Sequence, residues 1–240
     1  MIGRMLFEQG RMELRLTLRR GEAVLLTLIV PVSLLLFFGA TNLFEIELGF
    51  LVPGLLTLSV MSSALVALAI ATGFERKYMV LKRLGATPLP RWVLFAGKMA
   101  ATLFLEILQL SIILGAARLI LDYRPSVSWW ALTLAVVLGT CAFGGVAFLL
   151  SGTLRAEATL AVVNGLFVAF FGLGGVMFAV ENLPRPLAAV ADILPAAGLS
   201  EAFRWATGFS DSVGHGLWVL MFWAVAAPML AVRLFSWEEK

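Results

Sequence analysis

The chain has 240 residues, of which 61% are hydrophobic and 14% are charged, and its mean hydropathy is +0.97. A soluble domain of this size needs more polar surface than this composition can supply, so lipid must surround most of the chain. The net charge of +3 does not indicate a nucleic-acid partner, because the Lys and Arg residues stand in short blocks between apolar runs.

Six apolar stretches are long enough to cross a membrane. A helix rises about 1.5 Å per residue and the hydrocarbon core is about 30 Å thick, so a crossing takes about 20 residues. The stretches lack the alternation of a membrane barrel, which predicts an all-α integral membrane protein. We expect a six-span transmembrane domain over residues 23–240, with spans at residues 23–40, 49–71, 99–121, 129–150, 160–180 and 216–235.

The segment before the first span carries charged residues three or four positions apart, which places them on one face of a helix. Residues 1–22 are therefore expected to form an amphipathic helix in the cytoplasmic interface, with its basic side chains among lipid headgroups. Contact with a partner domain is the alternative interpretation. The charged positions are Arg4, Glu8, Arg11, Arg15 and Arg19.

The connection at residues 72–98, between the second and third spans, has the signals of a short helix of its own. Thr72 and Glu75 have the spacing of a capping box, which predicts that a new helix begins there. Gly85, followed by Pro88 and Pro90, predicts its end. Spacing alone indicates no more than an amphipathic helix along the membrane. Its polar face would carry Glu75, Arg76, Lys82 and Arg83, and its apolar face Phe74, Tyr78, Leu81 and Leu84.

The segment at residues 181–214 precedes the last span and is divided by prolines and glycines. Its two apolar pieces, residues 187–194 and 199–205, are each too short to cross the membrane. Pro186 suits a first helical turn, and Pro195 would end that helix. We expect two short outer helices that are either interfacial or re-entrant.

The Lys and Arg residues are distributed unevenly between the two sides of this topology. All of them fall on the side of both termini except Arg118, Arg124, Arg185 and Arg204. By the positive-inside rule, the sequence predicts a multi-pass membrane protein with its N- and C-termini in the cytoplasm.

Polar residues inside the predicted spans are the candidate functional residues of the membrane region. Glu106 lies about 12 Å inside the third span, counted from Lys98, and Gln109 follows one turn later. A central charge costs about 2.5 to 3.5 kcal/mol on insertion scales, so Glu106 should face protein, water or a cavity, or be protonated. A substrate or proton role and a structural hydrogen bond remain open, whereas Asn164 is expected to bind a neighbouring helix.

Several chemistries are excluded by what the sequence lacks. No G-x-x-x-x-G-K-[ST] string is present, and the glycines within the spans indicate close helix packing or local bending. His215 is the only histidine and Cys141 the only cysteine, which argues against a serine protease within the membrane, a bis-histidine haem, a metal site or a disulfide. We expect no catalytic, metal or cofactor residue on this chain.

The loop after the second span, FERKYMVLKRLGATPLPRWVLFAGK at residues 74–98, resembles the corresponding loop of ABC-2 type transporter permeases. The resemblance extends over the whole chain, including the outer segment NLPRPLAAVADILPAAGLSEAFRWATG at residues 182–208. It implies that the helix after the second span is a coupling helix that docks into a separate P-loop ATPase, through Glu75, Arg76, Lys82 and Arg83. ATP and Mg²⁺ would then bind to that partner.

The same resemblance implies two copies of the permease above two ATPase subunits, which together move a hydrophobic or amphipathic, drug-like or lipid-like compound outwards across the plasma (inner) membrane. A lipid or glycan exporter of the same family is the alternative within transport. A membrane channel or scaffold without an ATPase is the alternative from another class.

Overall fold

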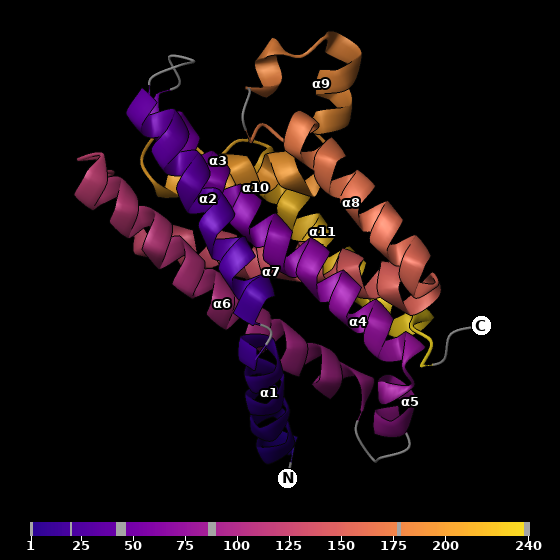
Figure 1. The fold of residues 1–240 in the computed structure, drawn as a ribbon. Helices are drawn as coiled ribbons and strands as arrows, with labels where there is room; N and C mark the ends of the chain where they lie inside the picture. The colour runs from indigo at the N-terminus through magenta and orange to yellow at the C-terminus, as the bar shows by residue number, and fades with distance from the viewer. Residues whose placement is uncertain (1, 20, 42–46, 86–89, 177–178, 238–240) are drawn as a thin grey trace.

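The computed structural model describes residues 2–19, 21–41, 47–85, 90–176 and 179–237, and all regular elements in these ranges are helices. The fold is therefore the all-α membrane fold that the sequence predicts (Figure 1). In chain order the elements are α1 Ile2–Arg19, α2 Gly21–Thr41, α3 Leu48–Val60, the π-helix η1 Met61–Ala67, α4 Leu68–Lys77, α5 Val80–Gly85, α6 Arg91–Ile120, α7 Trp129–Thr153, α8 Ala156–Leu173, the 3-10 helix η2 Val180–Asn182, α9 Arg185–Ala191, α10 Pro195–Ala206 and α11 Gly216–Leu234.

Five helical stretches among the described residues are long and apolar enough to cross a membrane. They are Leu48–Lys77, Trp92–Ile120, Trp129–Thr153, Ala156–Leu173 and Gly216–Leu234. The bent pair α9 and α10 would add a sixth if it is one span. The predicted first span corresponds to α2, which is 21 residues long. The predicted fifth span is displaced, because α8 begins at Ala156 and ends at Leu173, before the turn at Gly174 and Gly175.

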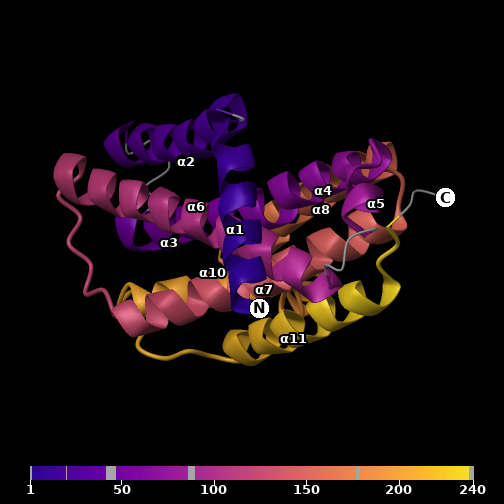
Figure 2. The ribbon, with the colours of Figure 1, turned by 90° about the horizontal axis from the view of Figure 1, so that it is seen from below.

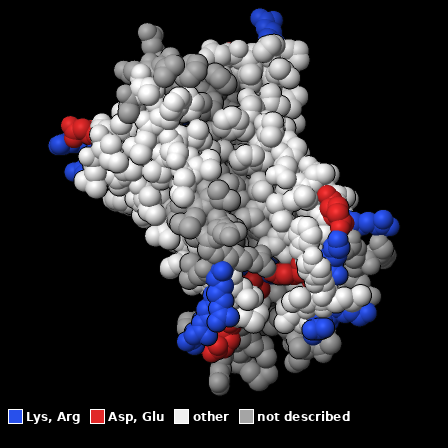
Figure 3. All heavy atoms as spheres, viewed as in Figure 1, with Lys and Arg blue, Asp and Glu red and all other residues white. Residues whose placement is uncertain are grey.

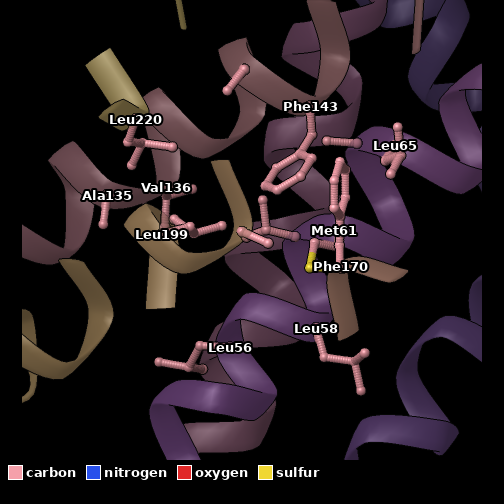
Figure 4. Close-up of a cluster of buried hydrophobic side chains, with 14 of the residues drawn as sticks. Leu56, Leu58, Met61, Leu65, Ala135, Val136, Phe143, Phe170, Leu199 and Leu220 are labelled. Atoms are coloured by element: carbon pink, nitrogen blue, oxygen red, sulfur yellow. The ribbon is translucent and has the colours of Figure 1, made fainter. Parts of the chain in front are cut away.

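Helix α7 lies at the centre of the bundle, where it packs against α4, η1, α10 and α11. The buried cluster combines Met61 and Leu65 of η1 with Phe143 of α7, Phe170 of α8 and Leu199 of α10 (Figure 4). Because lipid is as apolar as these side chains, close packing rather than escape from water holds such helices together.

The glycines of α7 allow neighbouring helices to approach closely, as the sequence predicts for glycines in the spans. A Cβ atom added at Gly145 would lie 2.5 Å from the backbone nitrogen of Pro228 in α11. A Cβ atom at Gly139 would lie 3.0 Å from the side chain of Leu199. Gly165 on α8 differs, because a Cβ atom there would meet nothing within 4 Å.

The outer segment forms the two short helices that the sequence predicts, and they meet at an angle of 77°. Helix α9 begins at Arg185, and Pro195 starts α10 after the turn that ends α9. Helix α10 packs among α3, α7 and α11, and its Ser200 hydroxyl donates a hydrogen bond of 2.8 Å to the Gly174 carbonyl. This burial inside the bundle favours the re-entrant arrangement over a helix that lies on the membrane surface.

The predicted helix start at Thr72 is wrong. The second span continues as one helix from Leu48 to Lys77, because α4 packs against α7 and α8 beyond the expected break. Tertiary packing thus overrides the capping signal at Thr72, which is fully buried. The chain turns at Met79, whose φ of 62° is left-handed, and the short helix is α5, which ends at Gly85 as predicted.

The two ends of the bundle differ in charge. Helices α1 and α5 and the last residues of α11 lie at the same end, and α1 crosses beneath the bundle in the view from below (Figures 1 and 2). Lys and Arg side chains gather at this end, while the body of the visible face is largely uncharged (Figure 3). We name this the basic end.

Candidate functional site

A buried cluster of three charged side chains connects three helices at the basic end. The Lys98 ammonium of α6 lies 3.0 Å from Glu13 Oε2 of α1 and 2.6 Å from Glu75 Oε2 of α4. The Gln9 amide donates a 2.9 Å hydrogen bond to Glu13 Oε1. Lys98 is 3% exposed, so this ion pair is much less screened by solvent than a surface pair.

The cluster changes the interpretation of the N-terminal helix. Arg11, Arg15 and Arg19 are exposed, as expected for an interfacial helix, but the Gln9 and Glu13 side chains are buried. Burial raises the pKa of the Glu13 carboxyl above its ordinary value, and the Lys98 ammonium acts in the opposite direction. Helix α1 is therefore amphipathic, and it is also joined to the membrane helices by a buried ion pair.

The four predicted docking residues separate into two pairs. Glu75 and Arg76 lie on α4 inside the bundle, where Glu75 pairs with Lys98 and the Arg76 guanidinium donates to the Ser151 carbonyl of α7. Arg76 is 4% exposed. Lys82 and Arg83 lie on α5 and are exposed. The prediction that the four residues share one face of a single helix is wrong, because the turn at Met79 places them on two helices.

The surface next to Lys82 and Arg83 is partly apolar. Tyr78, Met79 and Val80 are exposed by 66%, 54% and 43%. Leu81, between them, is fully buried and holds α5 against the bundle. We call the exposed segment Tyr78–Arg83 the α5 knuckle. Its exposed tyrosine, methionine and arginine are of residue types that are enriched at protein interfaces.

A cavity of about 480 Å³ lies beside the buried ion pairs. Its walls come from α1, the second span and α6, and most of its lining is apolar. Lys98 and Glu13 line one part of the cavity, and Ser63 and Leu105 line another. The sequence offered no signal for this cavity, because its walls are far apart along the chain.

Glu106 is fully buried within α6. Its Oε2 atom lies 2.5 Å from the Thr140 hydroxyl oxygen of α7, which also lies 2.7 Å from the Val136 carbonyl oxygen. Within the described part of the chain, Glu106 Oε1 has no hydrogen-bond partner. The structure thus places Glu106 against protein, which is one of the environments that the sequence predicts.

Gln109 lies on the same helix and bridges to the second span. The Ser63 hydroxyl donates a 2.8 Å hydrogen bond to Gln109 Oε1, and both side chains are buried. Ser63 belongs to the π-helix η1, whose wider coil interrupts the regular hydrogen bonding of the second span. Gln109 is therefore an inter-helix contact at the one described π-helical segment of the chain.

Asn164 does not bind a neighbouring helix in the described structure. Its side chain is exposed on α8, and its amide donates a 2.9 Å hydrogen bond to the Leu160 carbonyl of the same helix. It lies beside Gly165 on the side of α8 that faces away from the bundle. An inter-helix role for Asn164 would need a helix from another chain.

These observations define a multi-pass helical membrane protein with a basic end, a short exposed helix at that end and polar contacts between its spans. A model of the ABC-2 type transporter family matches residues 10–207, which is most of the chain. The protein therefore belongs to the ABC-2 type transporter family. No curated protein matches the sequence. Family membership makes the chain a transport permease of an ABC transporter, which works with a partner ATPase.

Proposed function

We propose that this chain is the membrane subunit of an exporter that moves a hydrophobic or amphipathic, drug-like or lipid-like compound outwards across the plasma membrane. A separate P-loop ATPase, with its ATP and Mg²⁺, would dock at the basic end, which would lie with both termini in the cytoplasm. The observation that carries the proposal is the exposed α5 knuckle at the end of the 30-residue helix Leu48–Lys77.

The knuckle is well placed to act as the coupling element. Leu81 anchors α5 to the bundle, while Tyr78 and Arg83 remain exposed for a partner. The preceding helix is about 45 Å long, so it extends through and beyond a hydrocarbon core of about 30 Å. A push on α5 would therefore be delivered directly to a membrane-crossing helix.

We propose two docking residues where the sequence suggested four. Lys82 and Arg83 remain the proposed docking cations, because they are exposed on the knuckle. Glu75 and Arg76 would instead support the knuckle from inside, through Lys98 and the Ser151 carbonyl. Their substitution would be expected to affect folding as well as docking.

The apolar lining of the cavity beside Lys98 favours a hydrophobic or amphipathic substrate over a glycan. A lipid exporter fits this lining equally well and differs from a drug exporter only in the cargo. We propose two permease copies with two ATPase subunits as the working assembly. A channel or scaffold is the remaining alternative, and it predicts no ATPase partner.

The proposal is tested by purifying the tagged chain in mild detergent from cells that retain its gene neighbourhood. We expect a P-loop ATPase to co-purify and ATP hydrolysis to accompany it. Mass analysis and an ATPase assay provide the two measurements. A chain that purifies alone and without ATPase activity would favour the channel or scaffold.

Charge reversal on the knuckle gives the first specific prediction. Arg83→Glu should weaken ATPase binding by about tenfold or more, equivalent to about 1.4 kcal/mol, because it places a carboxylate where we propose a docking cation. The measurement is the amount of ATPase retained by the immobilised permease. Membrane insertion and yield should remain at the level of the unmodified chain.

Arg155→Glu is the matched control, since Arg155 is also an exposed arginine in a predicted cytoplasmic connection but lies outside the knuckle. Equal losses for Arg83→Glu and Arg155→Glu would indicate a general effect of charge. An unchanged complex with Arg83→Glu would contradict the docking assignment.

A further inference from the structure

The Thr140 hydroxyl of α7 contacts one oxygen atom of α6 and one of its own helix, although it carries a single hydrogen. The Thr140 oxygen lies within hydrogen-bond distance of two other oxygens, Glu106 Oε2 at 2.5 Å and the Val136 carbonyl at 2.7 Å. A threonine hydroxyl has one hydrogen, so it can make a linear, full-strength hydrogen bond to only one of them. The carbonyl oxygen of Val136 has no hydrogen to give, so a second linear hydrogen bond at these short distances requires a hydrogen on Glu106.

A neutral Glu106 satisfies both contacts. Its carboxyl O–H donates to the Thr140 oxygen, and the Thr140 O–H donates to the Val136 carbonyl, as threonines in helices commonly do four residues back. An ionised Glu106 would take the Thr140 hydrogen. The Thr140 and Val136 oxygens would then face each other at 2.7 Å with no hydrogen between them.

The surroundings of Glu106 also disfavour a charge. Glu106 is fully buried, and no Lys, Arg or His among the described residues forms an ion pair with it. Along α6, Lys98 is about 12 Å away. An unpaired carboxylate in an apolar interior is expensive enough that the group takes up a proton instead.

The second carboxyl oxygen leads to the same conclusion. Glu106 Oε1 is buried without a hydrogen-bond donor among the described residues. Leaving a charged oxygen unsatisfied costs more than leaving a neutral carbonyl oxygen unsatisfied. The groups near Glu106 on the packed elements are Thr140 and the thiol of Cys141 on α7, together with the Ser63–Gln109 pair between η1 and α6, and none of them is a cation.

We propose that Glu106 is a proton-binding site in the membrane, held as a neutral carboxylic acid whose O–H bridges α6 to α7 through Thr140. The ligand of the site is a single proton. The inference concerns a protonation state that neither the transport role nor the ATPase partner requires. The proton would leave to water only if α6 and α7 separated enough to hydrate the carboxyl.

Infrared spectroscopy of the purified chain in lipid nanodiscs tests the proposal directly. At neutral pH the spectrum of the unmodified chain should contain the C=O stretch of a protonated carboxyl group, and Glu106→Gln should remove it. The Thr140→Val variant should shift this band, because it removes the hydrogen-bond acceptor. Thr140→Ser keeps the hydroxyl and should leave the band in place.

Thermal unfolding provides a second readout with a distinct outcome. The Gln amide can donate to Thr140 as the neutral acid does, so Glu106→Gln should unfold within a few degrees of the unmodified chain. Glu106→Leu lacks a donor and should unfold at a lower temperature. Absence of the protonated-carboxyl band at neutral pH, or equal destabilisation by Gln and Leu, would overturn the proposal.

Discussion

Lys98 lies between two carboxylates that reach it from different helices. Glu13 comes from the N-terminal helix and Glu75 from the end of the second span, so one ammonium group joins α1, α4 and α6. Removing one member of a buried ion pair leaves an uncompensated charge, which typically costs about 3 to 5 kcal/mol. Removing one of the three charged groups would therefore weaken the attachment of α1 to α4 and α6.

The raised pKa of Glu13 predicts a pH dependence of stability. The folded chain keeps the Glu13 proton to a higher pH than the unfolded chain, whose carboxyl has the ordinary value of 4.5. The contribution of this group to stability is complete below that value and is lost as the pH rises through the folded pKa. Thermal unfolding of the purified chain from pH 4.5 upwards should show a decline that is smaller in Glu13→Gln.

Glu8→Gln is the matched control for this experiment, because Glu8 lies on the same helix but is exposed. The Glu8 variant should retain the pH dependence of the unmodified chain. Identical profiles for Glu13→Gln and the unmodified chain would mean that Glu13 does not titrate differently in the folded state.

At the level of elements, α7 and α11 pack closely around a glycine. Gly145 faces the backbone of Pro228, and the two small surfaces allow the helix axes to approach. Backbone atoms cannot move aside as a flexible side chain can. The spacing of these two helices therefore depends on the absence of one Cβ atom.

Gly145→Ala should accordingly destabilise the chain by about 1 to 3 kcal/mol, the usual range for overpacking. The measurement is thermal unfolding of the purified protein in detergent. Gly115→Ala is the control, because a Cβ atom at Gly115 would meet nothing within 4 Å. The control should be neutral or slightly stabilising, since alanine favours a helix. Equal unfolding temperatures for the two variants would contradict this account of α7–α11 packing.

Sequence patterns predicted the helices well where the length of an apolar run determines whether a helix can cross the membrane. The five long apolar helices among the described residues, the two short outer helices and the end of α5 at Gly85 follow from local composition, although α8 is displaced from the predicted fifth span. The patterns failed where contacts between distant parts of the chain determine the structure. The capping signal at Thr72 is overridden by packing against α7 and α8, and the burial of Glu13 depends on Lys98, far along the chain.

At the scale of the whole molecule, α8 presents an uncovered side on which two glycines lie beside the exposed Val168. Asn164 and Gly165 are exposed there, and a Cβ atom at Gly165 or Gly172 would contact nothing within 4 Å. Small residues on one side of a membrane helix allow another helix to approach closely. This side of α8 is therefore suited to the second permease copy that we propose.

Pairing through α8 predicts the outcome of disulfide cross-linking. In a Cys141→Ser background, which removes the one cysteine of the chain, Gly165→Cys should form an intermolecular disulfide in native membranes. Met229→Cys is the control, because Met229 is 53% exposed on a different helix, α11. Cross-linked dimer is measured on non-reducing gels. Equal cross-linking at both positions would exclude a specific α8 contact.

The π-helix η1 sets the angular phase between the two halves of the second span. A π-helix closes its hydrogen bonds five residues back, so the coil holds more residues per turn than the α-helices on either side. One residue corresponds to a rotation of about 100° in an α-helix. The wide turn of η1 therefore holds an extra residue within Met61–Ala67 without turning α4 relative to α3. If the same residues were wound as regular α-helix, α4 would be turned through about that angle, Arg76 would point away from the Ser151 carbonyl, and α5 would leave the bundle in a different direction.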